Sequence, residues 1–336
     1  MTRRVLVTGG SGFVGRHLVD AFADAGHEVT AFDLRSEPWR DDVRFVEGDL
    51  CDALLVASLC EGKDTVVHNA SLVHTRRNME TRVWDVNLGG SRNVLAGCRA
   101  HGVRRLVYLS SASAVYEGRD IEGGDETMPY SSISQAPYAD SKIAAEKEIL
   151  AASDEALATV AIRPHVVFGP HDQRFLPAIL ERARQGRMRF AVGLGTWLSD
   201  FTYVDNLVDA VLAAEARLEP GGPVAGQAYF VTNGEPTAFF DFVGQVLAEL
   251  DLPPIVYRIP YPVVYAVAAI TEGLDTLRGG SLGGEHQLSR FAVRYLCTHH
   301  WFAIDKARRD LDWAPKVTIA EGIRRTAAWL RETGWT

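Results

Sequence analysis

The 336-residue chain is 47% hydrophobic and 23% charged, a composition typical of one large or two smaller globular domains. Its formal net charge is −8 and no block of Lys and Arg stands out. This argues against nucleic acid as a partner, because phosphate binding requires clustered cations. The cysteines (Cys51, Cys60, Cys98 and Cys297) show no paired spacing, and no signal peptide is evident. We therefore expect no disulfide framework, no metal site and a cytoplasmic location.

The first 110 residues alternate short apolar runs with helical patterns. Strands are predicted over residues 4–8, 28–32, 43–46, 65–68 and 105–110, and a helix over residues 12–25. This alternation predicts an α/β fold of the Rossmann type, in which a doubly wound parallel sheet carries helices on both faces.

Further along the chain the alternation loosens. A helix is predicted over 138–152 and a strand over 157–163, followed by helical patterns over 175–186, 206–216, 239–250, 305–311 and 319–331. We expect a dinucleotide-binding domain over residues 1–165, to which elements at about 200–216 return. A smaller, mainly helical substrate-binding lobe is expected over residues 166–336.

One uncharged segment, residues 259–271, is too short to cross a membrane. A buried or half-buried helix after Pro262 is the favoured interpretation. A pocket lid or a peripheral contact with lipid is the alternative.

Three glycines, Gly9, Gly12 and Gly15, follow the first predicted strand and open the first helix, with Phe13 and Val14 between them. Glycines in this context let the backbone approach a pyrophosphate, which the helix N-terminus then attracts. The segment therefore predicts a dinucleotide-binding turn.

An acidic residue, Asp33, ends the second predicted strand. A carboxylate there accepts hydrogen bonds from the adenosine ribose and repels a 2′-phosphate. We therefore predict NAD as the cofactor, although NADP is possible because Arg16 and Arg35 could reach such a phosphate.

Two later strand ends also point to the cofactor. Asp49 and Leu50 follow the third strand and could lie at the adenine ring, although a helix N-cap is an equal interpretation of Asp49. Asn69 and Ala70 follow the fourth strand, where small side chains would let the backbone approach the cofactor.

Tyr138 and Lys142 are four residues apart on a predicted helix and therefore share a face. A nearby ammonium favours the phenolate, so a tyrosine in this setting can take a proton from an alcohol or return it to a ketone oxygen. The fifth strand ends in serines at the edge of the sheet where ligands bind. Ser111 is the first choice for holding the reacting oxygen, and Ser113 is the second.

Together these residues resemble the extended short-chain dehydrogenase/reductase superfamily. The segments Leu-Ser-Ser-Ala-Ser-Ala-Val-Tyr-Glu-Gly (109–118), Ile-Arg-Pro-His-Val-Val-Phe-Gly-Pro (162–170) and Asp-Phe-Thr-Tyr-Val-Asp-Asn (200–206) are similar to the 3β-hydroxysteroid dehydrogenase branch, which includes the sterol-4-carboxylate 3-dehydrogenases. The resemblance implies that Tyr138 is the acid/base, that Lys142 supports it and that Ser111 is the catalytic serine. Pro164 and His165 would border the nicotinamide.

The C-terminal segments 289–291 and 296–302 also resemble the 2-alkyl-3-oxoalkanoate reductases. We therefore expect a small hydrophobic substrate, a steroid or sterol first and a fatty β-keto acid as the alternative. The resemblance to the sterol-4-carboxylate dehydrogenases and the resemblance to the 2-alkyl-3-oxoalkanoate reductases both allow a β-keto acid, which could lose carbon dioxide. Tyr265, Phe291 and Trp301, together with Tyr261, are candidates for an apolar pocket wall, although core packing explains them equally well.

A sugar-nucleotide epimerase or dehydratase is a second alternative, because Arg174 and Arg290 could bind a diphosphate. Against it, Pro164-His165 stands where such enzymes usually carry an Asn. A cofactor sensor without activity is a third alternative, which the presence of both Tyr138 and Lys142 disfavours. Helices flanking Tyr138 could form a homodimer.

Overall fold

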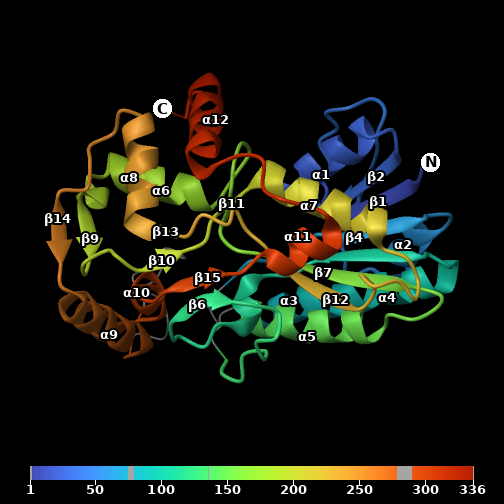
Figure 1. Ribbon diagram of the computed structural model, residues 1–336, viewed down its shortest axis with the longest axis horizontal. Coiled ribbons are helices and arrows are strands. Elements are labelled where there is room, and N and C mark those ends of the chain that lie inside the picture. Colours follow the sequence, from blue (N-terminus) through green and yellow to red (C-terminus); the bar gives the residue numbers. More distant parts are fainter. Residues whose placement is uncertain (1, 75–78, 135, 278–289, 336) are drawn as a thin grey trace.

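The computed structural model describes residues 2–74, 79–134, 136–277 and 290–335 (Figure 1). Its centre is a seven-stranded sheet with the order β12-β7-β5-β4-β1-β2-β3, in which every neighbouring pair is parallel. The strands are β1 (Arg4–Thr8), β2 (Glu28–Asp33), β3 (Arg44–Glu47), β4 (Thr65–His68), β5 (Arg105–Leu109), β7 (Ala158–Pro164) and β12 (Gln227–Val231). The chain runs outward from β1 to β3 and then continues at β4 on the other side of β1. The strand order therefore reverses at β1, which is the position where such sheets bind ligands.

Helices cover both faces of this sheet (Figure 1). α1 (Phe13–Asp24) and α7 (Val204–Arg217) pack together on one face, whereas α2 (Ala53–Cys60), α4 (Gly90–His101) and α5 (Pro137–Ala151) lie on the other. Along β1 the side chains of Val5 and Val7 join the first core and that of Leu6 joins the second. All three are fully buried. The continuous apolar strand patterns in the sequence thus correspond to strands covered on both sides. The Rossmann-type prediction is confirmed.

The sheet takes one more strand from the C-terminal half than the sequence indicated. α7 lies where a returning element was expected, but β12 also returns and pairs with β7 from Val160 to Pro164. α11 (Asp305–Leu311) then packs on both α7 and β12. A domain division at residue 165 stays a prediction.

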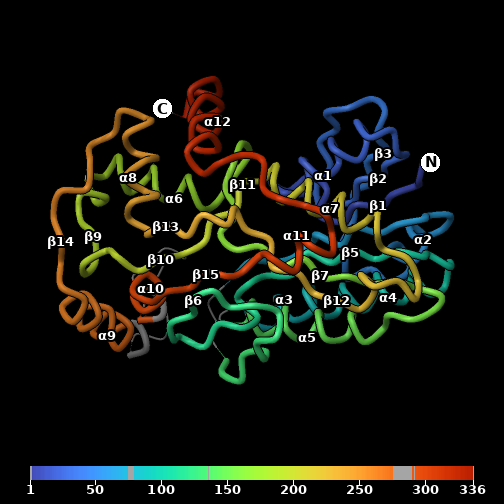
Figure 2. The backbone as a smooth tube through the Cα atoms, in the orientation of Figure 1, coloured from blue at the N-terminus to red at the C-terminus, as the bar shows by residue number. Residues whose placement is uncertain are grey.

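The second lobe lies at one end of the sheet, where Figure 2 shows the chain passing between the two parts several times. Its helices are α6 (Phe175–Arg184), α8 (Phe239–Glu249), α9 (Tyr261–Leu277), α10 (Arg290–Leu296) and α12 (Ile319–Glu332), with the short turn η4 (Arg187–Arg189) after α6. It also contains short strands, which the sequence did not reveal: β8 (Val167–Phe168), β9 (Phe190–Val192), β10 (Leu198–Ser199), β11 (Thr202–Tyr203), β13 (Thr237–Ala238), β14 (Tyr257–Ile259) and β15 (His300–Phe302). The order β13-β10-β15-β6 forms one small sheet, with β6 (Ile121–Gly124) supplied by the first half of the chain.

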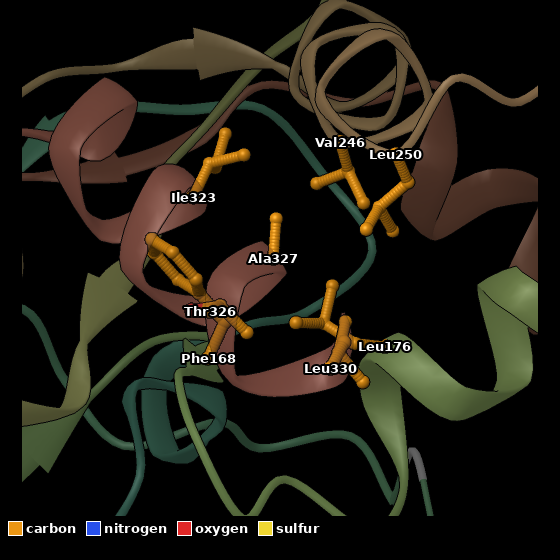
Figure 3. A pocket seen from close by; sticks show the side chains of 8 residues that line it. All are labelled: Phe168, Leu176, Val246, Leu250, Ile323, Thr326, Ala327 and Leu330. Carbon is orange, nitrogen blue, oxygen red and sulfur yellow. The ribbon is translucent and has the colours of Figure 1, made fainter. Parts of the chain in front are cut away.

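A small apolar gap lies inside this lobe between β8, α6, α8 and α12 (Figure 3). The eight side chains around it are Phe168, Leu176, Val246, Leu250, Ile323, Thr326, Ala327 and Leu330. Its volume is about 10 Å³, and the Thr326 hydroxyl already donates a hydrogen bond to the Gly322 carbonyl. The gap is therefore a packing space and offers no site for a ligand.

α9 corresponds to the uncharged segment and is half-buried. Val264 and Ala268 face the protein, whereas Val263, Val267 and Ile270 are exposed. The helix begins at Tyr261, so it includes Pro262, after which it was expected to start. This start is possible because proline is tolerated in the first helical turn. No helix within the described residues has both the length and the apolar composition to cross a membrane.

Candidate active site

A cavity of about 590 Å³ lies at the carboxyl edge of the central sheet. Its wall contains most of the side chains that the sequence singled out: Gly9, Gly12, Phe13, Val14, Asp33, Asp49, Leu50, Asn69, Ala70, Ser111, Tyr138, Lys142 and Pro164. These residues come from six strand ends and two helices. The parallel sheet therefore gathers them because the carboxyl ends of its strands share one edge.

The glycine turn is held by close backbone contacts. Gly9 has φ +68°, and a Cβ atom there would lie 2.8 Å from the Cα atom of Ala70. A Cβ atom on Gly15 would lie 1.8 Å from the carbonyl oxygen of Gly9. Side chains at these positions would push the turn away from the neighbouring strand end, so the structure requires glycine at both.

The turn fits a dinucleotide. No side chain caps the N-terminus of α1, so its first N–H groups remain available to an anion. Asp33 accepts hydrogen bonds from the backbone N–H groups of Ser11 (3.0 Å) and Leu34 (2.7 Å), and its side chain also lines the cavity. Burial raises the pKa of Asp33, and these backbone hydrogen bonds oppose the rise. Of the two arginines that could favour NADP, Arg16 stacks on Trp39, with 4.4 Å between its guanidinium carbon and the ring centroid.

Asp49 is not the N-cap of the following helix. That position belongs to Asp52, whose carboxylate accepts from the N–H groups of Leu54 and Leu55 (both 3.1 Å). Asp49 instead binds the Arg82 guanidinium at 2.7 Å in the cavity wall. This ion pair holds the pKa of Asp49 below its usual range.

A hydrogen-bonded chain supports the middle of the cavity. Ser91 donates to the Asn87 carbonyl at 2.5 Å, so its oxygen accepts from Nε2 of His68 at 2.9 Å. The other ring nitrogen, Nδ1, therefore accepts from the Thr8 hydroxyl at 2.7 Å. Burial lowers the pKa of His68 to about 3, and the charge of Lys142 adds to this shift. His68, on β4, is thus neutral, and its two ring nitrogens link this strand to β1 and α4.

Asn87 connects two walls of the site and escaped the sequence analysis. It lies in the short π-helix η2 (Asp85–Gly89), which continues α3 (Glu80–Trp84). Its side chain accepts from the N–H group of Leu72 (2.7 Å) and donates to the Ser141 hydroxyl (3.0 Å). Asn69 makes a similar link by donating to the Gly9 carbonyl at 3.1 Å. The insertion of a π-turn often marks a functional position, but it has no signature in a single sequence.

Tyr138 lies at the first turn of α5 and lines the cavity together with Ser111, whose side chain acts to lower the pKa of the Tyr138 phenol. Ser111 precedes the short turn η3 (Ala112–Val115) and accepts from the Ser113 hydroxyl at 2.9 Å, which leaves its own proton for Tyr138. Burial raises the pKa of Tyr138, whereas the bond from Ser111 and the charge of Arg174 lower it. The structure thus distinguishes the two serines, because Ser111 lines the cavity with Tyr138, whereas Ser113 donates to Ser111 and is not among the described residues of the cavity wall.

Lys142 lies one turn after Tyr138 and is 2% exposed. Its ammonium donates to the Leu109 carbonyl and lies 4.2 Å from the centroid of the Tyr108 ring. Burial lowers the pKa of Lys142 to about 7, and the charge of Glu146 opposes the shift. Lys142 is therefore close to its titration point at neutral pH.

Glu146 continues the same face of α5 and is fully buried. Its carboxylate accepts from Nε of Arg163, at 3.0 Å and 3.2 Å, and from the Tyr130 hydroxyl at 2.8 Å. Both charges of this pair are away from water, so removing one would leave the other uncompensated.

The two residues predicted to border the nicotinamide differ in their exposure to the cavity. Pro164 lines the cavity, whereas His165 is buried, at 5% exposed, and is not among the described residues of the wall. Nδ1 of His165 donates to the Asp200 carbonyl at 2.7 Å, so Nε2 accepts from the Tyr295 hydroxyl at 2.6 Å. The two residues share this buried contact although 130 positions separate them.

The predicted substrate residues lie outside the cavity wall as far as the described residues show it. Tyr265, on α9, accepts from Arg294 at 3.3 Å and packs against Tyr261. Trp301 lies on β15 with its ring against Gly123. Phe291 belongs to α10, and its side chain lies outside the described part of the structure.

Arg174, which the epimerase or dehydratase alternative assigns to a diphosphate, contributes a positive charge to the cavity wall. It immediately precedes α6, whose N-terminus is held by Asp172. Asp172 accepts from the N–H groups of Arg174 (2.8 Å), Phe175 (3.1 Å) and Leu176 (2.8 Å). The Arg174 guanidinium donates to the Val73 carbonyl, and its charge reaches Tyr138.

Comparisons with known proteins identify one family and agree on the fold. The family model described as "3-beta hydroxysteroid dehydrogenase/isomerase family" matches residues 6–260. A 2-alkyl-3-oxoalkanoate reductase from Stenotrophomonas maltophilia is 41% identical over 97% of this chain and 98% of its own length. A decarboxylating sterol-4-alpha-carboxylate 3-dehydrogenase from Mus musculus is 34% identical over 96% of this chain and 90% of its own length. An epimerase structure from Methanothermobacter thermautotrophicus has a TM-score of 0.79 at 25% identity, over 99% of this chain and 94% of that one.

Proposed function

The chain belongs to the 3-beta hydroxysteroid dehydrogenase/isomerase family, and we propose that it interconverts a secondary hydroxyl and a ketone on a hydrophobic substrate with NAD as cofactor. It is a dehydrogenase or reductase that acts on CH–OH groups. The observation that carries the proposal is that Tyr138 and Ser111 line the same cavity as the glycine turn and Lys142.

The chain's own residues perform the proton transfer. Tyr138 takes the proton from the substrate hydroxyl at its phenolic oxygen, or returns it to the ketone oxygen in the reverse direction. Ser111 donates a hydrogen bond toward the same position and fixes the reacting oxygen. The family resemblance assigns Lys142 the role of favouring the Tyr138 phenolate, whereas in the structure Ser111 and Arg174 oppose the rise that burial causes in the pKa of Tyr138. The glycine turn, Asp33 and Lys142 would hold NAD, which when bound accepts or supplies the hydride.

The substrate class follows from what two relatives share. One is named for a 3-oxoalkanoate with an alkyl group at carbon 2, and the other for a sterol with a carboxylate at carbon 4 that reacts at carbon 3. In both, the reacting carbon neighbours the carbon that bears the carboxylate. We therefore propose a β-hydroxy or β-keto acid with a large apolar body. A 4-carboxysterol and a 2-alkyl-3-oxoalkanoate are the two candidates within this class, and a 3β-hydroxysteroid, which has no carboxylate, is the alternative outside it.

A substrate panel tests this proposal. Formation or consumption of reduced nicotinamide is followed with a 4-carboxysterol, a 3β-hydroxysteroid and a 2-alkyl-3-oxoalkanoate. With a UDP-sugar the products are instead separated by chromatography, because epimerisation or dehydration leaves no net change in nicotinamide. Turnover of one of the first three supports the proposal. Turnover of the sugar nucleotide alone would replace it with the epimerase or dehydratase alternative.

The cofactor preference has its own test. We assign Asp33, which lines the cavity, to the adenosine ribose, so its charge should repel a 2′-phosphate by about 1–3 kcal/mol. Titration with each nucleotide should therefore give an affinity for NAD at least about 10-fold higher than for NADP. Equal affinities, or an Asp33→Asn variant with an unchanged preference, would refute this assignment.

Two expectations from the sequence stay part of the proposal, namely a cytoplasmic location and a homodimer formed through the helices beside Tyr138. Sedimentation analysis would decide the second, and a monomer at micromolar concentration would exclude it.

A further inference from the structure

A strained turn lies in the cavity wall where β7 ends. Val166 has φ +33°, which is uncommon for any residue except glycine and an outlier for a β-branched side chain. Pro164, Val166 and Val167 line the cavity, whereas His165 between them is buried. Such a backbone conformation persists only where its surroundings enforce it, and such positions cluster at functional sites. The neighbours of this strained turn (residues 164–167) therefore have to hold it in place.

Hydrogen bonds from the second lobe hold the strained turn. The Thr202 N–H group donates to the Val166 carbonyl at 3.1 Å, and the Thr202 hydroxyl donates to the His165 carbonyl at 2.6 Å. The His165 ring is fixed at both nitrogens, by the Asp200 carbonyl at 2.7 Å and by the Tyr295 hydroxyl at 2.6 Å. Thr202 begins β11 and Asp200 precedes it, whereas Tyr295 lies on α10. The Tyr295 hydroxyl therefore ties a helix of the second lobe to the cavity wall.

The strained turn also lies beside the predicted reacting centre. β5 and β7 are neighbouring parallel strands, and where they end the Ser110 N–H group donates to the Ile162 carbonyl at 2.7 Å. Ser111 follows at the end of β5 and lines the same cavity as Val166 and Tyr138. The Val166 side chain therefore borders the part of the cavity in which a substrate would meet Ser111.

We propose that Tyr295 is a positioning residue of the reaction, because its hydroxyl holds His165 and thereby keeps Val166 in the conformation that forms an apolar wall beside the substrate. A displacement of about 1 Å at such a wall can cost about 100-fold in rate. Affinity for NAD should change little, because the glycine turn and Asp33 follow β1 and β2, which β4 and β5 separate from β7. This inference rests on the proposed function of the same site.

Two substitutions in the strained turn measure the strain. Glycine adopts a positive φ without a steric penalty, whereas alanine does not. Val166→Gly should therefore melt at a higher temperature than Val166→Ala, although glycine is usually the more destabilising replacement. Val46, which is partly buried on β3, is the matched position, and there the alanine variant should melt at the higher temperature. A Val166→Ala protein that melts above Val166→Gly would overturn the proposal.

The contribution of Tyr295 is then measured in two backgrounds, with NAD and a 2-alkyl-3-hydroxyalkanoate. Tyr295→Phe keeps the ring but removes the hydroxyl, and it should lower kcat about 10-fold with KM for NAD within about 2-fold of the wild type. Added to Val166→Gly, the same substitution should lower kcat by less than about 2-fold, because the side chain that the hydroxyl positions is already absent. Tyr229→Phe, outside the cavity wall, should change kcat in neither background. An equal loss from Tyr295→Phe in both backgrounds, or no loss in either, would refute the positioning role.

Hydrogen exchange decides the inference independently of turnover. In Tyr295→Phe the backbone amides of residues 165–168 should exchange at least about 5-fold faster than in the wild type, whereas those of the glycine turn should be unchanged. Unchanged exchange at residues 165–168 would overturn the proposal. Faster exchange without turnover of any substrate in the panel would leave the link from Tyr295 to the strained turn assigned and refute only the proposed reaction.

Discussion

The two halves of the cavity are built in different ways. The half expected to hold the cofactor is centred on a turn whose residues lie close together in the sequence, and backbone contacts hold this turn. Gly9 and Gly15 are six residues apart, and Asp33 anchors the same turn through Ser11. The substrate half joins Ser111, which follows β5, Tyr138 on α5, and Arg174, which precedes α6. A local motif therefore encodes one half, and long-range packing encodes the other.

This difference predicts which substitutions lower kcat and which lower the affinity for NAD. Side chains dominate the substrate half, so substitutions there should leave the fold and the cofactor site intact. Backbone geometry dominates the other half, so an added methyl group should disturb both stability and affinity for NAD.

The largest effect is expected at the centre of the substrate half. Tyr138→Phe removes the group that moves the proton and should lower kcat about 10²- to 10⁴-fold, with NAD affinity nearly unchanged. Nicotinamide absorbance measures the first quantity and calorimetry the second. Tyr229→Phe is the matched control, because Tyr229 lies on β12 outside the cavity wall. A Tyr138→Phe protein with wild-type kcat would contradict the mechanism.

In the cofactor half the strongest effect should come from Gly15→Ala. The new methyl group would overlap the Gly9 carbonyl, so we expect unfolding to require about 3 kcal/mol less free energy and NAD to bind at least about 10-fold more weakly. Denaturant titration and calorimetry measure these changes. Gly244→Ala on α8 is the control, because a Cβ atom there meets nothing within 4 Å. That substitution should stabilise the protein by about 0.5–1 kcal/mol. Equal stability of the two variants would refute the idea that the turn is set by backbone contacts.

Lys142 belongs to both halves, and its burial predicts how stability changes with pH. Its pKa falls from the usual 10.5 to about 7 in the folded protein. Between these values the unfolded chain binds one more proton, so the contribution of Lys142 to stability rises with pH, by at most about 1.4 kcal/mol per pH unit. Below pH 7 both states are protonated and the contribution is constant.

Denaturant titrations at pH 7, 8 and 9 would measure this dependence as the difference between the wild type and Lys142→Met. Glu146→Gln removes the charge that opposes the shift, so its rising window should begin at a lower pH than in the wild type. A difference between wild type and Lys142→Met that does not vary with pH would show that Lys142 keeps its ordinary pKa.

The smallest effect distinguishes two neighbouring aspartates. Asp52→Ala removes the N-cap of α2 and should cost about 1 kcal/mol of stability without changing NAD affinity. Asp49→Ala should leave the cap intact and weaken NAD binding through the cavity wall. If Asp49→Ala destabilised the protein as much as Asp52→Ala, the assignment of the N-cap to Asp52 alone would be refuted.

The sequence by itself determined the features that depend on local geometry. The five early strands, the helix after Gly12, the glycine turn and the spacing of Tyr138 and Lys142 were all readable, because period, turn chemistry and four-residue spacing act over a few residues. The choice of family also came from short contiguous segments, and the family match confirms it.

Only the tertiary structure decided what depends on contacts between distant segments. β12 was missed as a sheet strand because its pairing with β7 spans more than 60 residues of chain. The proximity of Arg174 to Tyr138, the link of Asn87 to Leu72 and Ser141, and the burial of His165 against Tyr295 have no local signature. Their positions result from how the second lobe and the helices pack on the edge of the sheet, where burial and long-range hydrogen bonds decide which side chains meet.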